Sequence, residues 1–174
     1  MSLTRSVCLM MLAAATLWGQ SPPKNPVTSA VREILPRQQK NLTEAVGEMP
    51  ASKFDYKPTP QQMTFAHLVV HITNSNNYLC AKIGDAAAPK TPELKETDGK
   101  DKLLAALKSS FAFCSTALEK VDDSKLGDTI QAFGGREAPK AWALFALSND
   151  WADHYGAAAM YLRLNGLMPP TAKK

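Results

Sequence analysis

Apolar residues recur at helical spacing in four long segments of this chain, and nowhere do they alternate with polar residues for long enough to predict a strand. The spacing predicts helices at residues 29–48, 62–84, 100–121 and about 139–165. Pro36 lies inside the first of these helices and should kink or split it, because proline lacks an N–H group and crowds the preceding turn. Four long helices joined by connectors of moderate length predict an all-α fold, a four-helix bundle.

The first 20 residues have the pattern of a secretory signal. Arg5 precedes a run of eleven mostly apolar residues, and small residues follow it, which places cleavage between Ala15 and Gln20. The apolar run is too short for a membrane span, which needs about 20 residues. We therefore predict a cleavable signal peptide at 1–20, an exported (periplasmic or secreted) protein with no membrane span after cleavage, and one domain at 21–174. A buried N-terminal helix is the alternative.

The composition and overall charge bear on the domain organisation and on nucleic acids as a class of partner. The chain of 174 residues is 45% hydrophobic, which suits a single globular domain with a substantial core. Its formal net charge is only +4, and the basic residues are scattered among acids without interleaved aromatic residues. Nucleic-acid binding is therefore not indicated.

Two cysteines remain after the predicted cleavage, Cys80 and Cys114, and each lies near the apolar stripe of its helix. If the second and third helices were antiparallel neighbours, they could bring the two residues to the Cα separation of a disulfide, roughly 4.4–6.8 Å. An exported protein could retain such a bond. However, Cys80 lies close to the end of its helix, whereas Cys114 is several turns into the next. A disulfide and two buried free thiols are therefore both open.

A polar cluster marks the fourth predicted helix. Asp150 and His154 are four residues apart and share one helix face, flanked one turn away by alanines that leave a notch for a ligand or an ion. His67 and His71 are likewise one turn apart on the second helix. In a bundle, inward side chains from facing helices build metal sites in this way. Surface ion pairs and half-buried hydrogen-bonded histidines give the same spacing, so they remain alternatives.

Three stretches of the sequence resemble the DinB-like family: the connector MPASKFDYKPTP, the helical segment TFAHLVVHI and the closing HYGAAAMYLRLNGLMPP. The resemblance covers roughly residues 27–170. It implies a four-helix bundle of the DinB-like type, with a divalent metal held by three histidines, one on the second helix and an H-x-x-x-H pair on the last.

At these positions the sequence has His71, Asp150 and His154, so it departs from the family's usual pattern at Asp150. Two histidines and one carboxylate can still hold zinc, iron, manganese or nickel. His67 is a candidate fourth ligand or proton-transfer group. In the alternative interpretation the site has decayed, and Asp150 simply accepts a hydrogen bond from His154.

The resemblance implies a metal-dependent enzyme with a small-molecule substrate, because relatives of the family include thiol-dependent transferases and isomerases. Hydrolysis of an ester or amide is an equal enzymatic interpretation. The alternative from another class is a non-catalytic exported bundle with a binding or stress-related role. Asn74, Tyr78 and Tyr161 are candidates to line the substrate pocket of such an enzyme. The sequence leaves open whether the protein forms a homodimer.

Overall fold

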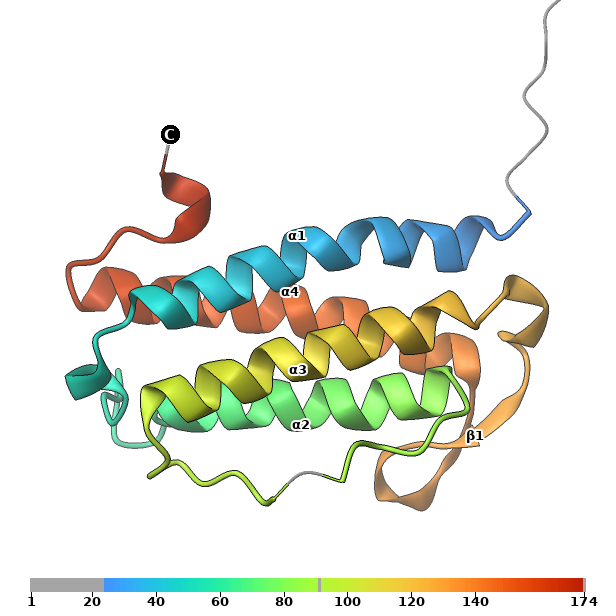
Figure 1. Ribbon diagram of the computed structural model, residues 1–174, viewed down its shortest axis with the longest axis horizontal. Helices are drawn as coiled ribbons and strands as arrows, with labels where there is room; N and C mark the ends of the chain where they lie inside the picture. Colours follow the sequence, from blue (N-terminus) through green and yellow to red (C-terminus); the bar gives the residue numbers. More distant parts are fainter. Residues whose placement is uncertain (1–23, 91, 174) are drawn as a thin grey trace, which may run out of the picture.

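The computed structural model describes residues 24–90 and 92–173, which form a bundle of four long helices (Figure 1). The predicted signal peptide lies outside these residues. The helices are α1 (Pro26–Glu48), α2 (Phe65–Ile83), α3 (Lys100–Glu119) and α4 (Lys140–Leu164). Pro36 lies within α1, which continues through it as one helix, so the predicted split does not occur. None of these helices is long and apolar enough to cross a membrane.

A small β-hairpin between α3 and α4 departs from the sequence-based prediction of no strand. Strand β1 (Thr129–Gln131) pairs antiparallel with β2 (Glu137–Pro139). Gly134 and Gly135 turn the chain between them with φ values of 71° and 76°. Strands of three residues are too short to show an alternating pattern. Four 3₁₀ turns complete the connectors: η1 (Ala51–Lys53), η2 (Asp123–Lys125), η3 (Phe133–Gly135) and η4 (Pro170–Ala172).

The helices form two parallel pairs. The connector between α2 and α3 runs back along the length of the bundle, so these two helices point the same way, while α1 and α4 both point the opposite way (Figure 1). Helix α2 packs against α3 on one side and α4 on the other. The antiparallel arrangement assumed for α2 and α3 in the sequence analysis is therefore wrong.

Parallel packing decides between the two states of the cysteines. Cys80 on α2 and Cys114 on α3 lie at the same height, and they form a disulfide with a Cα separation of 5.1 Å. Both residues are fully buried. One turn further on, α2 ends at Gly84, where an added Cβ would come within 2.8 Å of the Ala117 Cβ. The glycine therefore allows the two helices to approach closely.

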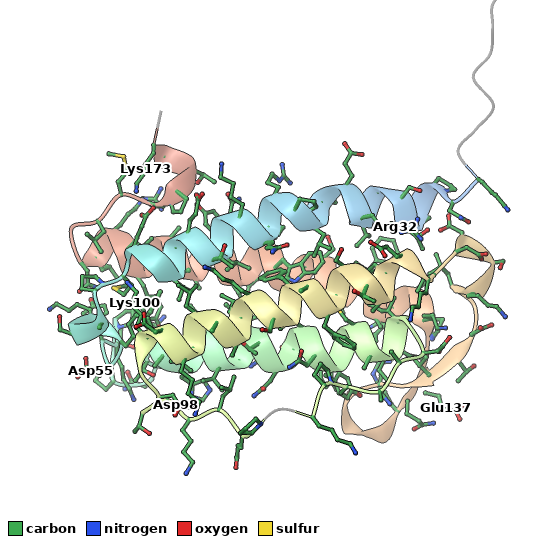
Figure 2. All side chains as sticks on the ribbon, in the orientation of Figure 1. Arg32, Asp55, Asp98, Lys100, Glu137 and Lys173 are labelled. Atoms are coloured by element: carbon green, nitrogen blue, oxygen red, sulfur yellow. A yellow bond between two sulfur atoms is a disulfide. The ribbon has the colours of Figure 1, made fainter. Side chains whose placement is uncertain are left out.

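Two basic side chains cap helix ends at opposite ends of the bundle (Figure 2). Arg32 on α1 donates from Nε to the carbonyl oxygen of Leu118 at 2.9 Å and from its guanidinium to that of Val121, where α3 ends. Lys100, the first residue of α3, donates to the carbonyl oxygen of Met49 at 2.8 Å, just past the end of α1. Cations stabilise the free carbonyls and the negative dipole end of a helix. These contacts fix α1 lengthwise against α3.

A buried polar chain ties α2 to both of its neighbours. The Trp151 indole on α4 donates to Asn76 Oδ1 on α2 at 2.7 Å, and Asn76 Nδ2 donates to Ser110 Oγ on α3 at 3.0 Å. Trp151 and Asn76 are both fully buried, so these bonds replace the water that each group lost on folding. Since Trp151 directly follows Asp150, the same chain fixes the height of Asp150 against α2.

An ion pair joins the far ends of the same two helices. Lys140 at the start of α4 is 1% exposed, and its Nζ lies 2.6 Å from a carboxylate oxygen of Asp85, just past α2. The α2–α4 pair is thus held at one end by this contact and at its middle by Trp151.

Candidate metal centre

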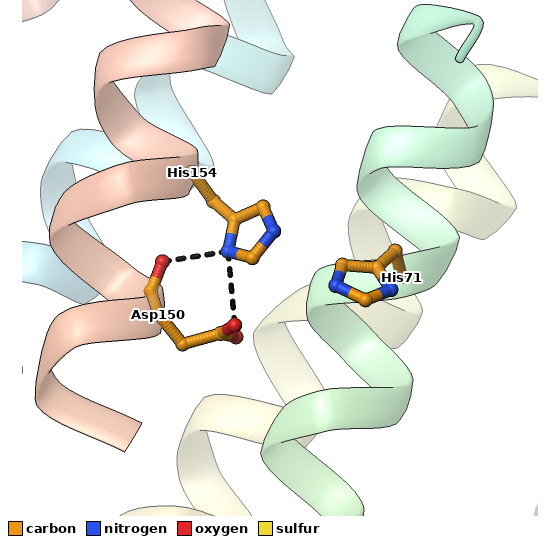
Figure 3. A group of neighbouring side chains, drawn as sticks. All are labelled: His71, Asp150 and His154. Carbon is orange, nitrogen blue, oxygen red and sulfur yellow. Dashed lines mark hydrogen bonds and ion pairs between the residues drawn. The ribbon is translucent and has the colours of Figure 1, made fainter. Parts of the chain in front are cut away.

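Helix α2 and helix α4 bring together three of the predicted site residues (Figure 3). His71 lies on the exposed face of α2, and Asp150 and His154 lie one turn apart on α4. One potential ligand atom from each residue lies within 4.8 Å of those from the other two. The rings of His71 and His154 face each other across the helix interface with centroids 4.8 Å apart.

The His154 ring is oriented by its own helix. Its Nδ1 donates to the backbone carbonyl oxygen of Asp150 at 2.6 Å and lies 3.3 Å from the Asp150 carboxylate (Figure 3). With the proton held on Nδ1, the lone pair of the neutral ring is on Nε2. A partner on one ring nitrogen is the usual way in which proteins prepare the other nitrogen for a metal.

The second carboxylate oxygen of Asp150 is the most informative atom of the site. Oδ2 is buried, and it has no hydrogen-bond partner among residues 24–90 and 92–173. A buried carboxylate oxygen without a partner is unfavourable, because it has lost its water and gained nothing in return. A divalent cation would satisfy it, and two imidazoles with one carboxylate are a ligand set that zinc, iron and manganese accept. The residues therefore fit a divalent ion.

The two histidines differ in how readily they hold a proton. Although His71 lies on the exposed face of α2, partial desolvation of its ring beside α4 lowers its pKa, and the positive charge of a protonated His154 lowers it further, so His71 favours the neutral form that binds metals. Burial also acts to lower the pKa of His154, but the hydrogen bond and charge of Asp150 outweigh it and the net shift is upward. A metal at this site would displace a proton from His154 more often than from His71.

His67 lies outside this cluster. Its Nδ1 is 2.6 Å from Glu96 Oε1, and Thr64 donates its hydroxyl to the other oxygen of Glu96 at 2.8 Å. The hydrogen bonds from Thr64 and His67 lower the pKa of Glu96. Glu96 belongs to the connector between α2 and α3, so no sequence spacing pointed to this pair. His67 is thus engaged with the connector and is not among the three residues whose ligand atoms cluster.

A pocket of about 330 Å³ opens beside His154. Tyr161 lines it as predicted, with its hydroxyl donating to the backbone carbonyl of Met63 at 2.6 Å. Ala157, one of the alanines of the predicted notch, also lines it. Its other lining residues were not predicted from the sequence: Gln61, Gln62, Met63, Leu68 and Asp153. Asp153 could have been found, since it lies one turn from Ala157; the connector residues could not.

The other two predicted lining residues lie elsewhere. Asn74 is on the exposed face of α2 and does not line this pocket. Tyr78 stacks on Phe133 of the hairpin with ring centroids 4.4 Å apart, and its hydroxyl donates to the backbone carbonyl of Gln131. Tyr78 therefore anchors the hairpin.

The fold and the site place the chain in one class of protein: four-helix bundles with a candidate metal centre between two facing helices. The family described as the DinB superfamily matches residues 34–158. The chain belongs to this superfamily. No curated protein matches the chain.

Solved structures share the fold. A DinB-like protein from Bacillus cereus is 16% identical, with a TM-score of 0.67, over 82% of this chain and 95% of its own. One from Bacillus subtilis is 21% identical, with a TM-score of 0.64, over 79% and 92%. A mycothiol-dependent maleylpyruvate isomerase is 14% identical, with a TM-score of 0.59, over 74% of this chain and 59% of its own. At these identities the likeness establishes the fold alone.

Proposed function

We propose that this protein is an exported enzyme that depends on a divalent metal held by His71, Asp150 and His154. The observation that carries the proposal is the buried Asp150 Oδ2, which has no hydrogen-bond partner in the described part of the chain and belongs to a carboxylate that clusters with two imidazoles. A carboxylate placed in this way would be expensive to keep without a cation.

The roles of the three residues follow from their surroundings. His71, with its lowered pKa, supplies a neutral imidazole from the exposed side. His154 supplies a second imidazole, which the Asp150 carbonyl holds in one orientation. Asp150 supplies negative charge. Three protein ligands leave positions for a substrate, and the bound ion would act on it as a Lewis acid.

The adjoining pocket makes a small-molecule reaction the best fit. It lies against His154 and could hold the rest of a substrate whose reacting group lies near the metal. Two reaction types are consistent with such a site. One is thiol transfer or isomerisation, which the mycothiol-dependent isomerase of the same fold supports by analogy. The other is hydrolysis of an ester or amide, which needs no cytosolic thiol and so suits an exported protein.

One contact favours a second candidate function, a non-catalytic bundle with a decayed site. The His154 ring already has a partner in Asp150, so part of the cluster is satisfied without a metal. This candidate leaves Asp150 Oδ2 unexplained, and we therefore rank it second.

The proposed export rests on the signal-like sequence of residues 1–20. The Cys80–Cys114 disulfide supports it, because such bonds persist in oxidising compartments. N-terminal sequencing of the protein from its native host would test it. An intact Met1 on protein from the cytoplasm would exclude export.

Metal content and activity test the enzymatic proposal together. Protein purified without chelators should contain about one divalent ion per chain, measured by elemental analysis. Panels of thiol-transfer substrates and of esters should then be assayed with and without EDTA. Activity that EDTA removes and added metal restores would support the proposal. Metal-free protein that takes up no zinc, manganese or nickel would favour the non-catalytic candidate.

A further inference from the structure

The pocket beside His154 has an asymmetric charge. Apart from His154 itself, Asp153 is its only charged lining residue within residues 24–90 and 92–173. The Asp153 side chain is exposed to solvent, and the next residue in the chain is the proposed ligand His154. The remaining wall is neutral: it consists of the amides of Gln61 and Gln62, the apolar Met63, Leu68 and Ala157, and Tyr161.

The shape of the pocket shows where a ligand would extend. Its lining on α4 runs from Asp153 and His154 to Tyr161. Tyr161 follows His154 by seven positions on α4, which corresponds to about 10 Å at 1.5 Å per residue. Asp153 lies at the end of this wall next to His154, so a substrate that reaches from the proposed metal into the pocket would enter it beside Asp153.

We infer that this pocket holds the non-reacting end of the substrate, and that Asp153 selects substrates with a cationic or neutral end over those with a carboxylate. This inference rests on the proposed metal-dependent function, because it needs the other end of the substrate at His71, Asp150 and His154. The favoured substrate class is a short aminoalkyl or uncharged acyl compound. A carboxylate in the pocket would meet the like charge of Asp153 without a lysine or arginine among the lining residues to offset it.

Three matched probes separate charge from size: β-alanine hydroxamate with a distal ammonium, butyrohydroxamate with a distal methyl, and succinic acid monohydroxamate with a distal carboxylate. Each presents the same metal-chelating group. Binding is followed by the visible spectrum of the Co(II)-loaded protein and by calorimetry, so no turnover is required. Non-thiol probes also leave the Cys80–Cys114 disulfide intact.

For each protein, the preference is the dissociation constant of the carboxylate probe divided by that of the ammonium probe. This preference should be about fivefold to tenfold larger in the wild type than in Asp153→Asn. Comparing the two proteins with the same probes cancels the attraction that a bound metal exerts on any anion. Asp153→Lys should reverse the preference. High salt should reduce it, because the carboxylate is exposed and its charge is screened.

Glu119→Gln is the matched control. It also removes one exposed negative charge, but from the end of α3, an element that contributes no residue to the pocket. It should leave the wild-type ratio unchanged. Equal ratios in wild type and Asp153→Asn would overturn the inference alone, since the metal site would still be intact. A protein that takes up no Co(II) would overturn the proposed function and the inference with it.

Discussion

The two sides of helix α2 are built differently. On the α3 side, Cys80 is covalently bound to Cys114, and Gly84 allows backbone contact with Ala117. On the α4 side, His71 is exposed, and the facing Asp150 has a buried oxygen without a partner in the described residues. The first interface is covalently linked and closely packed at Gly84, while the second holds the His/Asp/His cluster beside an open pocket.

The difference shows how a small bundle can remain stable with a buried carboxylate oxygen that lacks a hydrogen-bond partner. Groups that lack partners reduce stability, so they persist only where the surrounding structure holds them in place. Here the α2–α3 interface provides much of that support, and Asn76 links it to α4 through Trp151. Variants on the α4 side should therefore change binding more than stability, and variants on the α3 side should do the reverse.

The largest effect should come from the proposed ligands. His154→Ala should lower the affinity for zinc or manganese by about 10³-fold or more, equivalent to about 4 kcal/mol, because it removes a ligand outright. Asp150→Ala should lower it by about 10²-fold or more, since the imidazoles remain. Asp150→His should retain or tighten binding by restoring the histidine usual in the family. Isothermal titration of metal-free protein measures each affinity.

His67→Ala is the control for the ligand series. His67 lies outside the cluster of His71, Asp150 and His154, so the variant should change the metal affinity by less than about threefold. A larger loss would make His67 a ligand through its other nitrogen. If the wild type binds no metal and Asp150→His gains binding, the site has decayed and the enzymatic proposal fails.

Removal of the disulfide should have the largest effect on stability. The bond closes a loop with a sequence separation of 34 residues. Replacing both Cys80 and Cys114 with alanine should lower the free energy of unfolding by about 3–4 kcal/mol, mainly by releasing the unfolded chain. Denaturant titration measures this loss, and the metal affinity of the folded variant should be nearly unchanged. Two alkylated thiols in non-reduced protein, seen by mass spectrometry, would contradict the disulfide.

Asn76→Ala should affect both interfaces at once. It removes the acceptor of the buried Trp151 indole, so the free energy of unfolding should fall by about 2–3 kcal/mol. Because Trp151 fixes Asp150 against α2, the metal affinity should also fall, by about tenfold. Ser110→Ala is the control, since it removes the bond from Asn76 and the bond to the Leu107 carbonyl within α3 but leaves the Trp151–Asn76 bond in place, so the metal affinity should stay intact. Equal metal affinities in Asn76→Ala and wild type would show that this chain does not position the site.

A pair of glycine variants gives the smallest and most local effect. Gly84→Ala places a Cβ within 2.8 Å of Ala117 Cβ and should lower the free energy of unfolding by about 1–3 kcal/mol, because the helices must move apart. Gly156→Ala, at a solvent-exposed position of α4, meets nothing within 4 Å and should instead stabilise the helix by up to about 1 kcal/mol. Thermal unfolding of the two variants should show melting temperatures shifted in opposite directions.

The sequence was sufficient to predict the positions of the helices and the residues of the candidate metal centre. Helical spacing of apolar residues is a local signal, so it located four helices with ends within a few residues of those observed. The spacing of Asp150 and His154 gave their common face, and the family resemblance selected His71 as the residue opposite. The sequence could not show that an oxygen of Asp150 is buried without a partner, because the burial of a single atom depends on every neighbouring element.

What only the tertiary structure decided was the direction of the helices and the contacts of the connectors. Cys80 is near the end of α2 and Cys114 lies well inside α3, yet each is at a similar distance from the start of its helix. They meet because the connector returns along the bundle and makes the two helices parallel, and no local pattern encodes that choice. The same connector brings Glu96 to His67, and the preceding one brings Gln61 and Gln62 to the pocket. Local spacing fixes which residues share a helix face, but only long-range packing fixes which faces meet.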